Sequence, residues 1–180
     1  EILLGLELKP VAAPEPNLTG SRIQKLGETA EGIVSLGKEF EPNLEKIVKL
    51  NPELMLGFSY SAEQNNKLFS NIAPTVGIDY VQAGWKDALL QIGEITGKQK
   101  QAQQLLDEYQ QRVKVLRTKL SNKNNQKTVT ISRFYTGNNT PEFRNKFSFP
   151  VSVISELGLS IPEKQNQITT TSEDPYVSVS

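Results

Sequence analysis

Two arginines and three aromatic residues have the side-chain types and positions that suit ligand binding. Arg133 and Tyr135 come at the end of a predicted strand, and Arg144 follows the polar loop after it. Tyr60 comes two residues after another apolar run, and Trp85, the only tryptophan, comes shortly after a third. In open α/β sheets, ligands bind beyond the carboxyl ends of the strands, where these residues fall. A guanidinium group makes charge-assisted hydrogen bonds to anionic oxygens, so we expect a ligand that carries such oxygens.

Each of these residues also has a simpler interpretation. Either arginine could form a surface salt bridge, which contributes little to stability. Tyr60 could be an ordinary amphipathic surface residue, and Trp85 could pack at the start of a helix. The sequence leaves these alternatives open.

The chain contains no histidine and no cysteine. This removes the commonest general base and the strongest metal ligands, and it excludes His-based triads, zinc hydrolysis and thiolate sites. Residues 93–98 resemble a phosphate-binding loop, but the run is one residue short and is followed by Gln99 where Ser or Thr is needed. We therefore expect no catalytic residue, no metal held by the protein and no intrinsic cofactor.

Charge and hydropathy are those of an ordinary globular chain. The 180 residues include 20 basic and 20 acidic side chains, so no overall field attracts the chain to nucleic acid or to an anionic membrane. No apolar run approaches the roughly 18 residues that cross a bilayer. Glu1 is followed at once by a half-apolar stretch, 2–8, and we expect the start to be an internal cut or a processed end.

Helices and strands alternate over residues 1–97, which predicts an α/β lobe with a parallel sheet. Frequent prolines and glycines break the first forty residues into one short strand and loops. The apolar run at 54–58 is typical of a strand buried on both faces. The predicted elements are a strand at 11–13, a helix at 41–50, strands at 54–58 and 74–78 with a helix at 62–72 between them, and a helix from Trp85 to a break at Gly97.

Residues 98–120 have the most regular helical pattern, with apolar side chains at steps of three and four. A helix of this length spans roughly 35 Å, enough to connect two lobes. Beyond it, the β-type alternation at 128–132 and the helical spacing at 151–157 predict a second α/β lobe over 121–180.

The runs Gly37–Ile47 (GKEFEPNLEKI) and Leu50–Gly57 (LNPELMLG) resemble a signature of the periplasmic binding proteins for siderophores and cobalamin. The segments 72–75 and 136–144 follow in the family's order, and the second is close to a pattern of the ferric-siderophore branch. The resemblance implies an α/β fold of two Rossmann-like lobes joined by one long α-helix, with the ligand between the lobes. Relative to that fold the first strand is missing and the second lobe stops midway, so we expect the chain to be incomplete at both ends.

The resemblance also implies roles for individual residues. The ligand would be a ferric siderophore, which supplies the iron ligands itself, so that iron enters only as this complex. Tyr60 matches a ligand-contacting tyrosine of ferrichrome-binding relatives, whereas Glu39 stands where those relatives have an arginine, and this leaves the exact ligand open. Glu45 fits the position of a glutamate that docks onto the permease, with Glu41 as a second candidate; helix-surface solvation is the alternative for both.

The implied function is that of a substrate-binding component of an ABC importer, and not of an enzyme. Its partners would be the permease and its ATPase, and it would be a monomer in the periplasm or on the outer face of the bacterial cytoplasmic membrane, with or without a lipid anchor. One alternative is a receptor for cobalamin, haem or another chelate on the same fold. A small α/β enzyme is the second alternative, which the missing phosphate loop, nucleophile elbow and histidine weaken.

Overall fold

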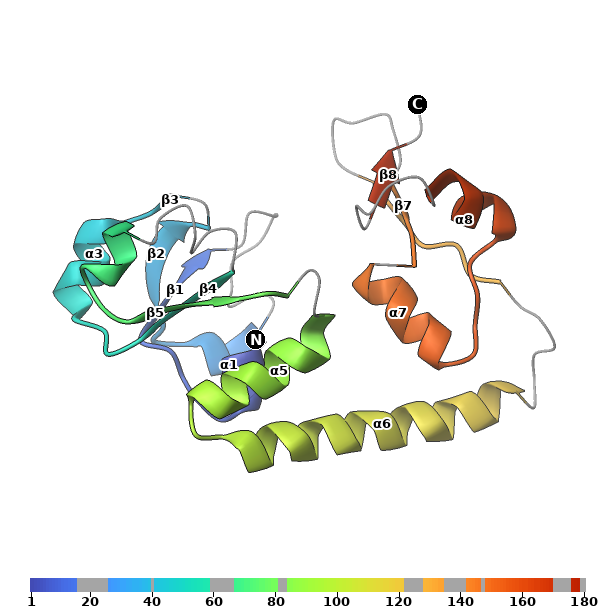
Figure 1. Cartoon of the computed structure of the whole chain (residues 1–180), viewed down its shortest axis with the longest axis horizontal. Helices are drawn as coiled ribbons and strands as arrows, with labels where there is room; N and C mark the ends of the chain where they lie inside the picture. Colours follow the sequence, from blue (N-terminus) through green and yellow to red (C-terminus); the bar gives the residue numbers. More distant parts are fainter. Residues whose placement is uncertain are drawn as a thin grey trace. The chain divides into compact units, whose positions relative to one another are not determined.

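The computed structural model describes residues 1–15, 26–39, 41–58, 67–80, 84–121, 128–134, 142–146, 148–169 and 176–178 (Figure 1). The chain divides into two compact units, Glu1–Leu105 and Leu106–Ser180, and each is described by itself. Both units mix helices with strands, which confirms the predicted α/β class.

In the part of unit 1 that the structure describes, the strands form two small sheets. β1 (Ala12–Glu15) pairs in parallel with β2 (Val34–Lys38), and β2 pairs in antiparallel fashion with β3 (Glu41–Pro42). β4 (Met55–Phe58) pairs in parallel with β5 (Thr75–Ile78) without a register shift. The sequence predicted β4 and β5 correctly, but it did not predict β2, which lies in the glycine-rich stretch assigned to loops.

The helices of unit 1 differ from the predicted ones mainly at their starts. The helix expected from residue 41 begins at Leu44, because Glu41 and Pro42 pair with β2 instead. Asn43 caps this helix, with its Oδ1 accepting a hydrogen bond of 2.9 Å from the Lys46 backbone N–H. Of the helix expected at 62–72, residues 67–70 are described and are helical. The other helices that lie entirely in the described part of unit 1 are α1 (Ile2–Gly5), the 3₁₀ helix η1 (Gly27–Ala30), α3 (Leu44–Leu50) and α5 (Gly84–Ile95).

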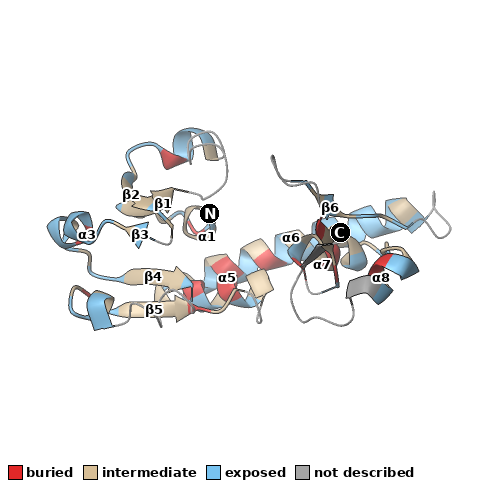
Figure 2. Cartoon of the chain, turned by 90° about the horizontal axis from the view of Figure 1, so that it is seen from above, coloured by how far each residue is buried: buried red, intermediate tan, exposed pale blue. Residues whose placement is uncertain are grey.

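One face of α5 contributes to the core of unit 1, as the predicted spacing requires. This face buries Ala88, Leu89, Ile92 and Gly93 (Figure 2). The backbone of α5 comes close to Ala102 at Gly93, where an added Cβ would lie only 2.6 Å from the Cβ of Ala102. By contrast, β4 is not buried on both faces as predicted: its residues are half-buried, and Phe58 is 50% exposed.

α6 (Gln99–Ser121) confirms the long helix predicted at 98–120. Its 23 residues correspond to a length of about 35 Å. Its first turns belong to unit 1 and the rest to unit 2, so the division between the units falls within this helix. Within the described ranges, no helix combines the length and the apolar character needed to cross a membrane.

Unit 2 contains an antiparallel three-stranded sheet in the order β6–β7–β8. The strand expected at 128–132 is shorter than predicted: Thr128 forms only an isolated bridge with Ser160, and β6 covers two residues. The helix predicted at 151–157 is confirmed, whereas the last helix was not predicted. The elements are β6 (Ser132–Arg133), β7 (Glu142–Arg144), α7 (Phe149–Glu156), α8 (Glu163–Thr169) and β8 (Tyr176–Ser178).

Candidate ligand-binding site

Both predicted arginines lie on one face of the unit 2 sheet. Arg133 in β6 is directly opposite Glu142 in β7, and residues that face each other across an antiparallel pair project to the same side. Arg144 follows Glu142 by two positions in β7, which places it on that side as well. We refer to Arg133, Glu142 and Arg144 as the arginine face.

An ion pair orders this face. Arg144 Nη2 donates to Glu142 Oε2 at 3.3 Å, and the two side chains are only 16% and 11% exposed. The simpler interpretation of Arg144 therefore holds in part, because a salt bridge exists, but this bridge is not on the open surface. A buried carboxylate requires a compensating positive charge, so Glu142 and Arg144 depend on each other.

The backbone of β7 is held from two sides. The Arg144 N–H donates to the Ile131 carbonyl at 3.0 Å. From α8, the Gln165 side chain donates to the Arg144 carbonyl at 2.8 Å and to the Ile131 carbonyl at 3.3 Å. Gln165 is itself buried. The Gln165 amide therefore links β7 to the residue that precedes β6. The sequence did not predict this link, because α8 lacks the apolar spacing that indicates a helix.

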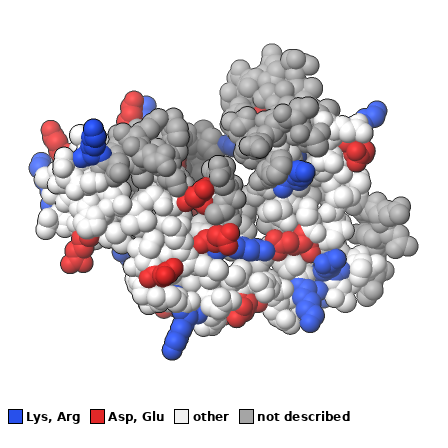
Figure 3. Space-filling view, in the orientation of Figure 1, with Lys and Arg blue, Asp and Glu red and all other residues white. Residues whose placement is uncertain are grey.

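The arginine face carries more positive than negative charge. Two guanidinium groups and one carboxylate leave one net positive charge on three residues. Elsewhere the charges are mixed, and Figure 3 shows basic and acidic side chains interspersed over the molecular face it presents. No group of three or more acidic residues in the described ranges is arranged to hold a metal ion. The local chemistry is that of a site for anionic oxygens.

In unit 1, aromatic residues lie at the carboxyl ends of β4 and β5. Because these strands are parallel, their ends meet at one edge of the sheet. The Phe58 and Tyr80 rings form an edge-to-face pair there, with centroids 6.1 Å apart and planes at 65°. Burial raises the pKa of the Tyr80 hydroxyl, and the Glu1 carboxylate raises it further. We refer to Phe58 and Tyr80 as the aromatic edge.

Tyr80 was not predicted, although the sequence contains a signal for it. Tyr60 comes two residues after the end of β4, and Tyr80 comes two residues after the end of β5. The position that suggests a ligand contact for Tyr60 is therefore shared by Tyr80. Tyr60 and Tyr135 lie outside the described residues, so their proposed roles stay predictions.

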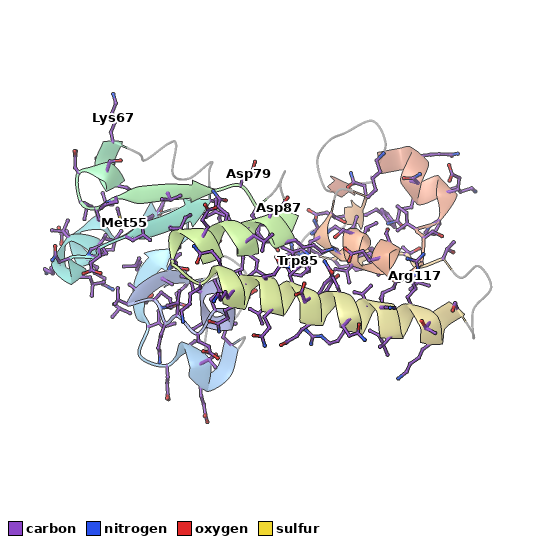
Figure 4. The ribbon with its side chains drawn as sticks, turned by 60° about the horizontal axis from the view of Figure 1, so that its bottom comes forward. Met55, Lys67, Asp79, Trp85, Asp87 and Arg117 are labelled. Atoms are coloured by element: carbon purple, nitrogen blue, oxygen red, sulfur yellow. The ribbon has the colours of Figure 1, made fainter. Side chains whose placement is uncertain are left out.

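Trp85 lies in the first turn of α5 and is half-buried (Figure 4). The Nζ of the neighbouring Lys86 is 5.8 Å from the centroid of the indole ring. A cation at this distance interacts favourably with the ring face. The position fits packing at a helix start, and a ligand contact by Trp85 stays a prediction.

The two glutamates predicted to dock onto a permease are both exposed. Glu41 is in β3, and Glu45 is in the first turn of α3, where a carboxylate is favoured by the helix dipole. The neighbouring Lys46 Nζ donates to the Ser35 carbonyl at 3.1 Å, which ties α3 to β2. The exposure of both glutamates satisfies the first requirement of a docking role, which stays a prediction.

Residues 1–141 match the model of a family described as periplasmic binding protein. The probable siderophore-binding lipoprotein YfiY of Bacillus subtilis is 31% identical over 98% of this chain and 53% of its own length. The chain spans about half the length of the curated relatives it matches.

Two solved structures share the fold. SirA of Staphylococcus aureus in complex with staphyloferrin B has a TM-score of 0.83 and 24% identity, over 99% of this chain and 60% of that one. FhuD of Vibrio cholerae with bound Fe³⁺-Desferal has a TM-score of 0.80 and 25% identity, over 99% of this chain and 67% of that one.

Proposed function

Because this chain belongs to the periplasmic binding protein family, we propose that it is part of the substrate-binding component of an ABC importer for ferric siderophores. The observation that carries the proposal is the arginine face, with two guanidinium groups on one side of a sheet, of which that of Arg144 is held by an ion pair. It is supported by relatives whose names refer to siderophore binding and by the Fe³⁺-Desferal bound to FhuD.

The proposed mode of binding leaves the iron coordination to the chelator. A siderophore surrounds ferric iron with hydroxamate, catecholate or carboxylate oxygens, so a protein chain without histidine or cysteine needs only to recognise the outer surface of the complex. Arg144 and Arg133 would donate charge-assisted hydrogen bonds to these oxygens. The aromatic edge, with Trp85 and Tyr60, would supply apolar contact, and Tyr135 would contribute beside Arg133.

The proposed partners are a permease and its ATPase. Glu45, with Glu41 as the second candidate, would dock the loaded protein onto basic residues of the permease. Such binding places the protein outside the cytoplasm, in the periplasm or on the outer face of the cytoplasmic membrane, as a monomer that a lipid anchor can hold there. No catalytic step is part of this role.

Native mass spectrometry of the full-length protein isolated from its source tests the proposal most directly. We expect a bound species whose mass and iron isotope pattern match a ferric chelate. Titration of the iron-free protein with ferric hydroxamate, catecholate and carboxylate chelates should then show saturable quenching of tryptophan fluorescence. Recovery of cobalamin or haem instead, with no response to any ferric chelate, would contradict it.

A further inference from the structure

The strongest unexplained feature of unit 2 is a buried carboxylate among the groups proposed to bind an anion. Glu142 is 8% exposed, lies opposite Arg133 and bonds to Arg144 at 3.3 Å. A site selected only for attraction to anionic oxygens would not include a negative charge at this position. Burying a carboxylate is also costly, so this residue requires a reason beyond packing.

Glu142 changes the charge that the face presents without removing its donors. With Glu142 ionised, the three residues carry one net positive charge; with a neutral residue in its place they would carry two. The change is local and largely buried, so it is screened by salt much less than a change at the surface. The donors on both guanidinium groups remain part of the face in either case.

We infer that Glu142 determines the charge selectivity of the site and limits its preference for highly anionic ferric chelates, an inference that rests on the proposed function. By holding Arg144 through an ion pair, Glu142 is a positioning residue as well. Glu142 lowers the net charge of the site by one unit, so the site with this carboxylate accepts chelates of low charge alongside anionic ones. The same site without it would favour anionic chelates more strongly.

The test compares two ferric chelates of different charge in the full-length protein. The probes are ferric staphyloferrin B, whose carboxylates give an anionic complex, and Fe³⁺-Desferal, whose hydroxamates cancel the ferric charge and whose free amine is cationic. The measured quantity is the ratio of the two dissociation constants. In Glu142→Gln we expect this ratio to shift about fivefold to tenfold toward the anionic chelate.

Two control variants separate selectivity from structural damage. Glu142→Asp keeps the carboxylate and should keep the wild-type ratio. Glu163→Gln makes the same chemical change at an exposed position of α8, where Glu163 accepts from the Gln167 side chain at 3.3 Å, and should leave the ratio unchanged. An unchanged ratio in Glu142→Gln, or an equal shift in Glu163→Gln, would overturn the inference.

Folding of the variants is checked by thermal denaturation. If Glu142→Gln does not fold, Arg133→Gln replaces it, because this change takes the net charge from one to zero. The ratio should then move toward Fe³⁺-Desferal, and a ratio equal to wild type would overturn the inference. If the wild-type protein binds neither probe nor any other ferric chelate, it is the proposed function that fails.

Discussion

The aromatic edge of unit 1 and the arginine face of unit 2 hold their side chains by different forces. Phe58 and Tyr80 meet edge to face, and half of Phe58 is open to solvent. On the arginine face, Glu142 and Arg144 form an ion pair that is almost covered. Aromatic contacts are short-ranged and tolerate ligands of many shapes, whereas charges discriminate by sign. We therefore expect general affinity to depend on unit 1 and charge selectivity to depend on unit 2.

The largest effect is expected from Arg144. Truncation to alanine removes a charge-assisted hydrogen bond and leaves Glu142 without its ion-pair partner, at a cost of about 2 to 5 kcal/mol in ligand binding. This corresponds to a loss of affinity of roughly 30-fold to a few thousandfold. Replacement by lysine should restore only part of it, because an ammonium group cannot reproduce the planar fork.

Fluorescence titration with a panel of ferric siderophores measures this loss. An Arg144→Ala protein that folds and binds its best ligand with wild-type affinity would assign Arg144 to a structural ion pair alone. The arginine face would then not contribute to charge selectivity, and the expected difference between it and the aromatic edge would be wrong.

The second effect concerns the packing of α5 against the start of α6 in unit 1. Gly93→Ala places a Cβ 2.6 Å from the Ala102 Cβ and 3.3 Å from the Lys98 carbonyl oxygen, and overpacking of this kind costs about 1 to 3 kcal/mol. The direction of the change in stability is informative, because replacing glycine by alanine at an open position in a helix would instead stabilise the protein by about 1 kcal/mol.

Urea denaturation measures the free energy of unfolding of this variant. Gly5→Ala is the matched control, since its Cβ would lie 3.7 Å from Leu105, an ordinary contact distance. Equal stability of the two variants would contradict the close packing of α5 against the start of α6.

A smaller effect is expected within the aromatic edge itself. A double-mutant cycle with Phe58→Leu and Tyr80→Leu should give a coupling energy of about 0.5 to 1 kcal/mol, near the lower end for aromatic pairs because Phe58 is half exposed. Thermal or urea denaturation of the four proteins provides the values. A coupling energy of zero would show that the pair does not order this edge.

The smallest effect is a pH dependence. The pKa of Tyr80 is raised above its ordinary value of 10.0 by burial and then by Glu1, so the folded state holds the phenolic proton more tightly than the unfolded state. The stabilisation is complete below pH 10.0 and is lost as the pH rises through the folded-state pKa. We expect Tyr80→Phe to reduce the loss of stability above this pH.

The measurement is the melting temperature of wild type and variant at a series of alkaline pH values. Tyr109 in unit 2 also has a raised pKa, because of burial first and of Glu156 second, and it contributes in the same direction in both proteins. The informative quantity is therefore the difference between them. A difference that stays constant with pH would contradict the raised pKa of Tyr80.

The elements that the sequence predicted are those with a strong local pattern. α5 and α6 have apolar residues at helical spacing over three turns or more, and β4 and β5 are apolar runs that each follow a proline, Pro52 and Pro74. α8 was missed because its sequence, EKQNQIT, is almost entirely polar. β2 was not predicted, because glycines surround it and lower its strand propensity. Its pairing with β1 stabilises the strand instead.

The residues of the candidate site also differ in whether a local sequence pattern could identify them. Arg133 could be selected from its residue type and its position at the end of a strand, and Arg144 from its residue type and the family resemblance of the loop segment that contains it. Glu142 could not, because its role depends on the register between β6 and β7, and register is set by contacts between distant segments. Gln165 had no local signal either, since its partners are 34 and 21 positions earlier in the chain.

These separations have a consequence for the order of assembly. The Gln165 amide joins Ile131 and Arg144, so the strands that carry the arginines gain this bond only after α8 has left the ribosome. Unit 1 has many of its contacts between neighbouring elements and is synthesised first, and domains generally fold as units during synthesis from the amino terminus. The aromatic edge is thus expected to form early, while a nascent chain that ends before residue 165 would lack the bond to the Arg144 carbonyl and the second bond to the Ile131 carbonyl. Protease sensitivity of stalled nascent chains at residues 131–134 and 142–144 should therefore fall once residue 165 is free to fold.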